Sequence, residues 1–309
     1  MNVVLLHNPG AGSGSGGDGL RALARTIRAE GHALRMQSTR DKAWKRALDE
    51  PTDLVAVQGG DGTVGRVAKH LLGRRVPLAV FAAGTANNVA MTLGIEGTSA
   101  EAQVASWTDP RRLAFDAAVA HGPFGTQTLI EGLGCGLLVW GMRHADDDAQ
   151  KEASREARMA RVLTMLMEQS AAHPAVRVEA TLDGHDLSGD YVLLEAMNTQ
   201  FIGPNLFLAP AGHPGDGLLD VVTVASDARD AMRERLASWQ RGALRPSDWP
   251  TRQGKQLVLQ WSGFPLHLDD EVWPDEGSAI EGPARIQVSM QPRALEFWVP
   301  QETEHPPVP

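Results

Sequence analysis

Residues 54–65 read Leu-Val-Ala-Val-Gln-Gly-Gly-Asp-Gly-Thr-Val-Gly. The apolar start predicts a buried strand, which runs directly into the turn Gly59-Gly60-Asp61-Gly62-Thr63 with its one carboxylate and one hydroxyl. Glycines let a ligand approach the main chain closely, and successive backbone N–H groups form a concave site for an anion. The turn therefore predicts an anion-binding connection between a strand and a helix. An ordinary tight turn without a ligand is the alternative.

Two other apolar stretches also end in glycine-bearing turns. Val3–His7 is followed by Asn8-Pro9-Gly10-Ala11-Gly12-Ser13-Gly14, and Val76–Phe81 is followed by Ala82-Ala83 and then Gly84-Thr85-Ala86-Asn87-Asn88. Helical patterns alternate with these strands, which predicts right-handed crossovers and a parallel sheet. Ligands bind at the carboxyl ends of strands in such sheets. The three turns together predict a nucleotide site, although the first lacks the P-loop ending and the dinucleotide fingerprint.

The pattern changes after residue 120 to short strand-like segments separated by Gly, Pro, Asn or Asp, which predicts an antiparallel, β-sandwich-like domain. We expect a Rossmann-like parallel α/β nucleotide-binding domain in residues 1–120 and a second, β-rich domain in residues 121–300. The last strand can pack back on the first domain, and residues 301–309 are expected to be a disordered tail. Other expected elements are helices over Asp41–Leu48 and Ala149–Ala172, and strands over Thr126–Gly132, Val176–Leu182, Tyr191–Met197, Leu219–Val224, Gln256–Trp261, Leu266–Leu268, Ile286–Met290 and Leu295–Val299.

The composition is that of an ordinary globular protein, with 42% hydrophobic and 22% charged residues in 309. No apolar run is long enough to span a bilayer, and the start at Asn2-Val3 leads us to expect no signal peptide. The net charge of −9 argues against a nucleic-acid partner. Cys135 is the one cysteine, which excludes an internal disulfide framework and fits a reducing cytoplasm. Peripheral membrane contact and a homodimer stay open.

The motifs resemble the diacylglycerol kinase catalytic family of soluble bacterial lipid kinases and sphingosine kinases, which shares its fold with NAD kinases. The resemblance runs through most of the chain. The matching segments are Asn8-Pro9 with its glycines, Gly59–Thr63, Gly84–Asn88, Phe115-Asp116, Leu208-Ala209-Pro210, Asp216-Gly217-Leu218-Leu219-Asp220-Val221 and Leu268-Asp269-Asp270-Glu271.

The resemblance implies a kinase that uses ATP and Mg²⁺ to phosphorylate a hydroxyl on a lipid or lipid-like acceptor, with both substrates in the cleft between the domains. Asp269 would be the general base and Glu271 its acidic neighbour, while Asp216 and Asn88 would hold the magnesium ion. Thr39 would lie near the adenosine. The implied ATP-binding residues are Asn8, Pro9, Gly12, Thr39, Gly59, Gly60, Asp61, Gly62, Thr63, Gly84, Thr85 and Asn87.

These residue types suit the chemistry. Phosphoryl transfer depends mostly on positioning and on neutralising charge, which glycine-turn amides and Mg²⁺ provide, and a carboxylate can accept the acceptor's proton. Asp269 and Glu271 share one face if their segment is extended. Without the resemblance, an acidic surface turn is the favoured interpretation of this segment. Asp216 and Asp220 are equally well interpreted as turn acids.

Three positions depart from the family's pattern. Arg66 and Asn88 stand where the family usually has acids, and Asp270 is an additional acid. These changes keep open a protein that binds nucleotide or lipid with degenerate catalysis, and the shared fold keeps open an NAD kinase-type activity.

The arginine pairs 74–75 and 111–112 are interpreted as solvated, and the histidines, including His267, as packing or surface residues.

Overall fold

The computed structural model describes residues 1–10, 16–144, 154–243, 246–275, 277–278 and 282–301. The chain divides into two compact units, Met1–Phe115 with Arg293–Pro309, and Asp116–Pro292. Strands β5 (Arg111–Gly122) and β18 (Ala284–Val299) contribute residues to both units. The expected disordered tail falls almost entirely outside the described residues.

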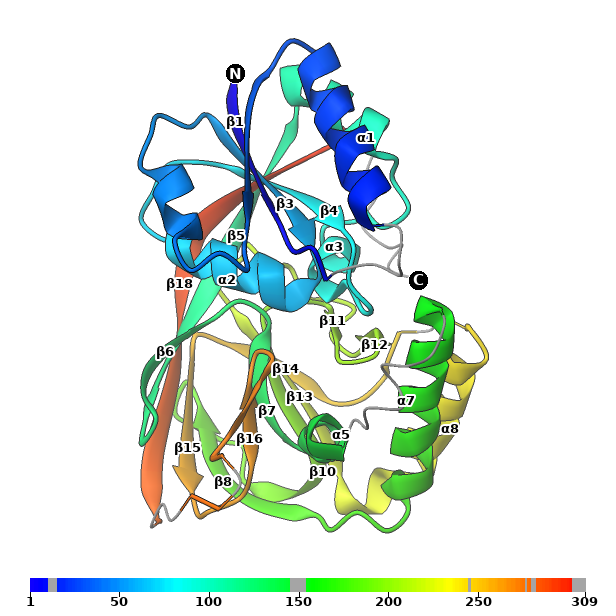
Figure 1. The fold of residues 1–309 in the computed structure, drawn as a ribbon. Helices are drawn as coiled ribbons and strands as arrows, with labels where there is room; N and C mark the ends of the chain where they lie inside the picture. The colour runs from blue at the N-terminus through cyan, green and yellow to red at the C-terminus, as the bar shows by residue number, and fades with distance from the viewer. Residues whose placement is uncertain (11–15, 145–153, 244–245, 276, 279–281, 302–309) are drawn as a thin grey trace. The chain divides into compact units, whose positions relative to one another are not determined.

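The first unit is built on a parallel sheet in the order β2-β1-β3-β4, as predicted (Figure 1). Its strands are β1 (Asn2–His7), β2 (Ala33–Ser38), β3 (Leu54–Gly59) and β4 (Leu78–Ala82). The inner strands are continuous apolar runs because both of their faces are buried. Val3 and Leu5 pack in one cluster with Leu23 and Ile27 of helix α1, while alternate residues point to the opposite face.

Short helices complete the first unit. They are α1 (Gly16–Ala29), α2 (Asp61–Leu71), α3 (Asn88–Thr92), α4 (Ala100–Ala105), and the 3₁₀ helices η1 (Trp44–Leu48) and η2 (Ser106–Thr108). The helix expected over Asp41–Leu48 is thus only the short η1. The segment soon reaches Pro51, and the residue before a proline is disfavoured in helical conformation.

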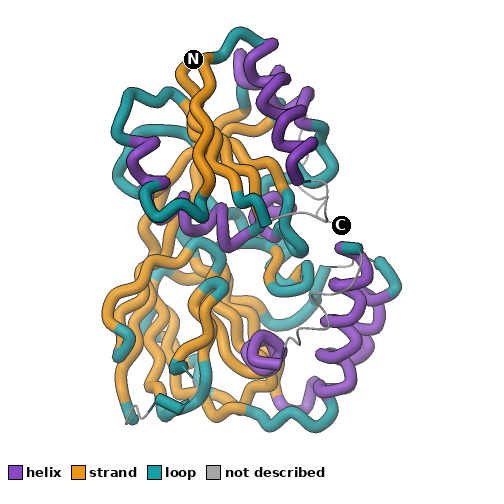
Figure 2. The backbone as a smooth tube through the Cα atoms, viewed as in Figure 1, coloured by secondary structure: helices purple, strands orange, loops and turns teal. Residues whose placement is uncertain are grey.

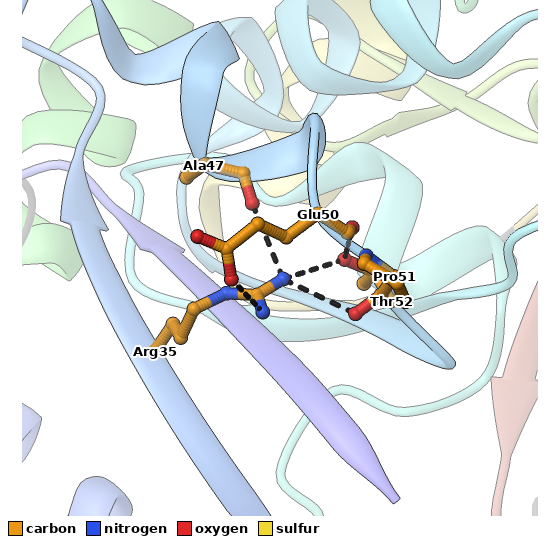
Figure 3. A network of polar contacts seen from close by, with 5 residues as sticks. All are labelled: Arg35, Ala47, Glu50, Pro51 and Thr52. Carbon is orange, nitrogen blue, oxygen red and sulfur yellow. Dashed lines mark hydrogen bonds and ion pairs between the residues drawn. The ribbon is translucent and has the colours of Figure 1, made fainter.

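Arg35 of β2 fixes the connection from η1 to β3 (Figure 3). Its guanidinium lies 2.7 Å from Glu50 Oε2 and donates to the hydroxyl of Thr52 at 2.9 Å and to the carbonyl of Pro51 at 3.3 Å. It also donates to the carbonyl of Ala47 at 3.5 Å. One side chain of β2 therefore satisfies a carbonyl group near the end of η1 and another in the connection that follows it.

The second unit is rich in β-strands (Figure 2). Its strands pair antiparallel, as predicted, in the order β17-β16-β7-β10-β8-β15-β18. Strands β13 and β14 extend from β10, β6 pairs with β5, and β9 pairs with β8. The strands are β6 (Gly125–Leu129), β7 (Gly132–Gly136), β8 (Val176–Leu182), β9 (His185–Asp186), β10 (Gly189–Met197), β11 (Phe201–Ile202), β12 (Leu206–Phe207), β13 (Leu219–Ala225), β14 (Thr251–Gly254), β15 (Gln256–Trp261), β16 (Leu266–Leu268) and β17 (Glu271–Trp273).

The structure differs from the sequence expectation at several elements of this unit. The expected strand Thr126–Gly132 is divided between β6 and β7, and the last two expected strands are halves of the single strand β18, in which Pro292 interrupts the apolar alternation. Helix α7 (Arg155–Ser170) begins later than expected, and residues 145–153 lie outside the described part.

Helices α5 (Leu137–His144) and α8 (Arg229–Gln240) and the 3₁₀ turn η3 (Ser226–Ala228) were not predicted. Five of the twelve residues of helix α8 are charged, and only Met232, Leu236 and Trp239 are buried along it. None of the helices in the described part of the chain combines the length and the hydropathy that a bilayer span requires.

Candidate active site

The three glycine-bearing turns of the first unit meet at one edge of the sheet. Because β1, β3 and β4 are parallel neighbours, their carboxyl ends at His7, Gly59 and Ala82 lie side by side. The N–H of Asn8 donates to the carbonyl of Gln58 at 3.0 Å, and the N–H of Ala83 donates to that of Gly59 at 2.9 Å. The predicted juxtaposition of the turns is confirmed, at the edge where ligands of such sheets bind.

Gly60 and Gly84 bring the second and third turns into direct backbone contact. A Cβ atom on Gly60 would lie 2.8 Å from Cα of Gly84, and one on Gly84 would lie 2.4 Å from Cα of Gly60. Asn87 supports this contact: its Oδ1 accepts from the N–H of Gly84 at 2.8 Å, while its own backbone is left-handed with φ of 61°. Only glycine fits at both positions, which leaves the backbone of both turns bare.

Asp61 joins the same two turns through its side chain. It is the first residue of α2, and its Oδ1 accepts from the N–H of Val89 at 3.0 Å. Desolvation by burial raises the pKa of this carboxyl group, against the opposing effect of hydrogen bonds from the backbone N–H groups of Asn87, Asn88 and Val89. Asp61 is therefore a support that fixes the third turn on the second.

The first turn is tied to the second by side chains. Asn8 Nδ2 donates to Thr63 Oγ1 at 3.4 Å, and Asn8 Oδ1 accepts from the N–H of Gly10 at 3.0 Å. Thr39 Oγ1 donates to the carbonyl of His7 at 3.2 Å, so the end of β2 also reaches this edge. Pro9 is exposed beside them, whereas Gly12 lies outside the described residues.

Arg40 adds a cation that the sequence did not single out. A Cβ on Gly10 would lie 1.9 Å from Arg40 Nη2, so the guanidinium packs directly against the glycine of the first turn. The one sequence feature that could have pointed to Arg40 is its position just after the carboxyl end of β2, one residue beyond Thr39. Guanidinium groups match phosphate oxygens in geometry as well as in charge.

In the second unit, Asp269 occupies a nest of backbone amides. Its Oδ1 accepts from the N–H groups of Ile130 at 3.1 Å, Glu131 at 2.9 Å and Gly132 at 3.1 Å, and its Oδ2 accepts from that of Ile130 at 3.0 Å. Asp269 is buried and left-handed, with φ of 54°. Such a nest stabilises a carboxylate in a fixed orientation, with Oδ1 more fully engaged than Oδ2.

Asp269 and Glu271 do not share a face, which corrects the expectation for an extended segment. Asp269 and Asp270 form the turn between β16 and β17, so the backbone reverses there. Asp269 is buried, whereas Glu271 is exposed. Glu271 therefore meets solvent and is not a partner in the nest.

His267, interpreted from the sequence as a packing or surface residue, is buried next to the nest. Its Nδ1 donates to the carbonyl of Asp269 at 3.0 Å, and its Nε2 lies 2.6 Å from Glu195 Oε2. Burial alone would lower the pKa of His267, but the charge and hydrogen bond of Glu195, together with the backbone hydrogen bond and charge of Asp269, outweigh it and the pKa is raised. A Cβ on Gly134 would lie 2.0 Å from Glu195 Oε2, so a glycine of β7 makes room for this pair.

A third group of acids surrounds the loop that precedes β13. Asp116 is fully buried, and its Oδ2 accepts from the N–H of Gly217 at 2.6 Å. Asp216 is exposed, and its Oδ1 accepts from the N–H of Leu218 at 2.9 Å. Desolvation, together with the charge of Asp216, raises the pKa of buried Asp220 to about 6, although a hydrogen bond from Gln253 acts against it. Asp116 thus fixes the loop that presents Asp216.

The described residues contain no group of three or more His, Cys, Asp or Glu side chains placed to hold a metal ion. Asp216 and Asn88, the two expected magnesium ligands, belong to different units. Mg²⁺ that accompanies nucleotide phosphates needs only one or two protein carboxylates and keeps several waters. Exposed Asp216 fits that requirement better than Asn88, which is buried and neutral.

The chain is similar to known protein families along most of its length. Residues 2–119 match the model of the diacylglycerol kinase catalytic domain, and residues 141–299 match the YegS C-terminal NAD kinase beta sandwich-like domain. The chain belongs to the diacylglycerol kinase-like family of lipid kinases. The resemblance seen in the glycine turns and in the segments around Asp216 and Asp269 is therefore confirmed.

Two relatives illustrate the breadth of this family. A diacylglycerol kinase of Mycobacterium tuberculosis is 29% identical over 259 residues, which are 80% of this chain and 79% of that protein. A Stenotrophomonas maltophilia protein named "Probable lipid kinase YegS-like" is 29% identical over 289 residues, 84% of this chain and 87% of that protein.

Solved structures agree on the fold. A diacylglycerol kinase from Bacillus anthracis superimposes with a TM-score of 0.70 at 22% identity, covering 96% of each chain. Yeast NADH kinase in complex with NADH gives a TM-score of 0.53 at 10% identity, covering 99% of this chain and 85% of that one. The kinase fold expected from the sequence, a parallel α/β part followed by a β-rich part, is confirmed.

Proposed function

We propose that this family member transfers the γ-phosphoryl group of ATP to a hydroxyl group on a lipid or lipid-like acceptor, with Mg²⁺ as the companion of the nucleotide. The observation that carries the proposal is the contact between Gly60 and Gly84 at the carboxyl edge of the sheet. It creates a surface of bare backbone where phosphates can lie against N–H groups.

ATP binding is proposed for the residues of this edge. Asn8, Thr63 and Gly10 form one hydrogen-bonded group beside the bare backbone, and the guanidinium of Arg40 lies over Gly10. Thr39, at the end of β2, is proposed to lie near the adenosine. The remaining proposed contacts are Pro9, Gly12, Gly59, Gly62, Thr85 and Asn87, with Asp61 holding the turns together.

We assign the role of general base to Asp269. A base must present an oxygen to the hydroxyl that it deprotonates. Oδ2 of Asp269 accepts from the N–H of Ile130, whereas Oδ1 accepts from the N–H groups of Ile130, Glu131 and Gly132. The nest holds the carboxylate in one orientation, so no reorganisation is needed during transfer. Glu271 is proposed as the exposed acidic neighbour of Asp269 that interacts with the lipid-like acceptor.

Magnesium, when bound with ATP, would neutralise charge on the transferred phosphoryl group. We propose Asp216 as its protein carboxylate, in the loop fixed by Asp116. Asn88 stays a weaker proposed ligand because its amide brings no charge. We also propose the cytoplasm as the compartment, since the single cysteine, Cys135, is a free buried thiol with no second cysteine for an internal disulfide, which fits a reducing environment.

The proposal is tested by offering purified protein ATP labelled at the γ-phosphate, Mg²⁺ and a panel of acceptors: diacylglycerol, a sphingoid base, a polyprenol and NAD. Label on one of the lipid acceptors is expected. Label on NAD alone would replace the lipid assignment by an NAD kinase activity. Tight ATP binding with no transfer to any acceptor would show a nucleotide-binding protein with degenerate catalysis.

A further inference from the structure

The first unit has a second concave feature, a pocket of about 650 Å³ that gathers four arginines. Its charged lining consists of Arg74, Arg75, Arg112, Arg293 and Glu296. The pocket is therefore strongly positive in a chain whose net charge is −9. From the sequence, the arginine pairs 74–75 and 111–112 are interpreted as solvated. The fold brings Arg74, Arg75 and Arg112 to one pocket.

Strand pairing explains this gathering. β18 runs parallel to β4 with Phe297 opposite Leu78, so the residues before Phe297 lie beside the segment that leads into β4. Arg74 and Arg75 are in that segment, and Arg293 is on β18. β5 pairs with β18 and supplies Arg112.

Two arginines of the pocket, Arg75 and Arg112, have donors available for a ligand, whereas Arg74 donates to the carbonyl of Leu48 at 3.1 Å. Arg75 is exposed and makes no hydrogen bond or ion pair with the residues that the structure describes. The side chain of Arg112 is 63% exposed and lies 3.8 Å from Glu296 Oε1. That carboxylate oxygen also accepts from Trp298 Nε1 at 2.8 Å. An exposed ion pair of this length is worth little, and one glutamate against four arginines leaves the pocket with a net positive charge.

The same pocket has an apolar side. Pro77, Leu295 and Trp298 line it, and the guanidinium of Arg112 lies over the Trp298 ring at 5.4 Å from its centroid. A cation held over an aromatic face is oriented without losing its outward N–H donors. Arginine forks next to an apolar wall fit a ligand that has a phosphate at one end and an apolar stem at the other.

This pocket is distinct from the proposed ATP site. It lies at the amino end of β4, whereas the Gly84 turn follows the carboxyl end of that strand. A strand of this length separates them by about 16 Å. We propose that the arginine pocket binds a phosphomonoester group carried on an apolar stem. The inference goes beyond the proposed kinase activity and does not depend on it.

The experiment measures binding of three probes with a non-hydrolysable ATP analogue present to fill the nucleotide site. The probes are phosphatidic acid in phosphatidylcholine vesicles, phosphatidylcholine vesicles alone, and glycerol 3-phosphate in solution. The test variant is Arg75→Gln with Arg112→Gln. The control is Lys42→Gln with Arg46→Gln, which removes the same charge from two exposed residues of the same unit outside the pocket.

We expect the wild-type chain and the control to bind the phosphatidic acid vesicles. The pocket variant should bind them about thirty-fold more weakly, since each basic residue near an anionic surface contributes about 1 kcal/mol. Binding of phosphatidic acid vesicles without binding of glycerol 3-phosphate supports a phosphate on an apolar stem, whereas glycerol 3-phosphate that binds as tightly as the vesicles would overturn the role of the apolar wall. Equal losses in both variants, unchanged binding by the pocket variant, or no binding by the wild type would overturn the proposal. Melting curves of all three proteins check that the variants are folded.

Discussion

Glu195 and His267 form a completely buried pair, with Oε2 of the glutamate 2.6 Å from Nε2 of the histidine and side-chain exposures of 0% and 1%. The other ring nitrogen, Nδ1, donates to the carbonyl of Asp269. Both ring nitrogens thus face acceptors, and the geometry suits an imidazolium between Glu195 and the nest of Asp269. The pair connects β10 to the turn that carries the proposed base.

The first prediction concerns the pH dependence of stability that this pair creates. The pKa of His267 is raised above its ordinary 6.5, so the stabilisation is complete below pH 6.5 and is lost as the pH rises through the folded-state pKa. Glu195→Gln leaves a buried cation without its counter-charge, which costs about 3–5 kcal/mol at pH 6. Denaturant unfolding at pH 6 and pH 9 should show this loss shrinking at the higher pH.

The matched control for that variant is Glu234→Gln, which changes an exposed glutamate on α8. We expect it to unfold like the wild type at both pH values. If Glu195→Gln also left stability unchanged at pH 6, the pair would not be charged in the folded protein.

The second prediction concerns Asp220, whose pKa of about 6 lies some two units above its ordinary 3.8. The folded protein therefore binds the proton of Asp220 more tightly than the unfolded chain does. Ionisation of Asp220 lowers the free energy of unfolding as the pH rises from 4 to 6, and the loss is complete above pH 6. Two units correspond to about 3 kcal/mol. Asp220→Asn keeps an acceptor for Gln253, so it should stabilise the protein by up to this amount at pH 8 and by little at pH 4.

Unfolding of Asp220→Asn is measured in EDTA, so that a bound cation cannot offset the charge. Asp49→Asn, at an exposed position, is the control and should have no such effect. A variant that was no more stable than wild type at pH 8 would contradict the raised pKa.

The third prediction concerns the backbone contact between Gly60 and Gly84. Gly60→Ala places a methyl group 2.8 Å from Cα of Gly84, and backbone cannot yield as a flexible side chain can. The second and third turns must then move apart, and ATP affinity should fall by about ten-fold or more. Calorimetric titration with ATP measures it.

Gly65→Ala is the control on the same helix, because a Cβ there meets nothing within 4 Å. It should leave ATP binding unchanged and stabilise α2 by about 1 kcal/mol, the difference in helix propensity between the two residues. ATP affinity equal in the two variants would remove the Gly60–Gly84 contact from the nucleotide site.

The fourth prediction is that Arg40 contacts the phosphates of ATP. Arg40→Gln removes the guanidinium that packs on Gly10, and a lost hydrogen bond to a charged group should weaken ATP binding by about ten-fold or more. Lys42→Gln, two residues further along the chain and exposed, is the control. Similar ATP affinities for the two variants would place Arg40 outside the nucleotide site.

The parallel sheet and its three turns could be predicted from the sequence because the signals are local and strong. Apolar runs end in glycines at β1, β3 and β4, and parallel pairing alone brings those ends together. The same reasoning could not find the roles of Asp61 and Asp269. Each carboxylate is held by backbone amides of a distant segment, at 87–89 and at 130–132, and no periodicity connects such partners.

Long-range partners also explain the other differences. His267 has no ligand-like spacing in the sequence, and its partner Glu195 is 72 positions away on another strand. Helix α8 was missed because its apolar stripe is only Met232, Leu236 and Trp239 among charged residues. The arginine pocket draws on three separate segments that only strand pairing brings together.

Asp269→Asn is the decisive variant for phosphoryl transfer from ATP to a lipid hydroxyl with Asp269 as the base, and Asp270→Asn is its exposed neighbouring control. Because the nest makes Asp269 structural as well, melting curves and ATP titration accompany the transfer assay. We expect Asp269→Asn to stay folded and to bind ATP with nearly wild-type affinity while transfer of the labelled phosphate to lipid is abolished, and we expect Asp270→Asn to transfer normally. Substantial transfer by folded Asp269→Asn would contradict the role of Asp269 as the base.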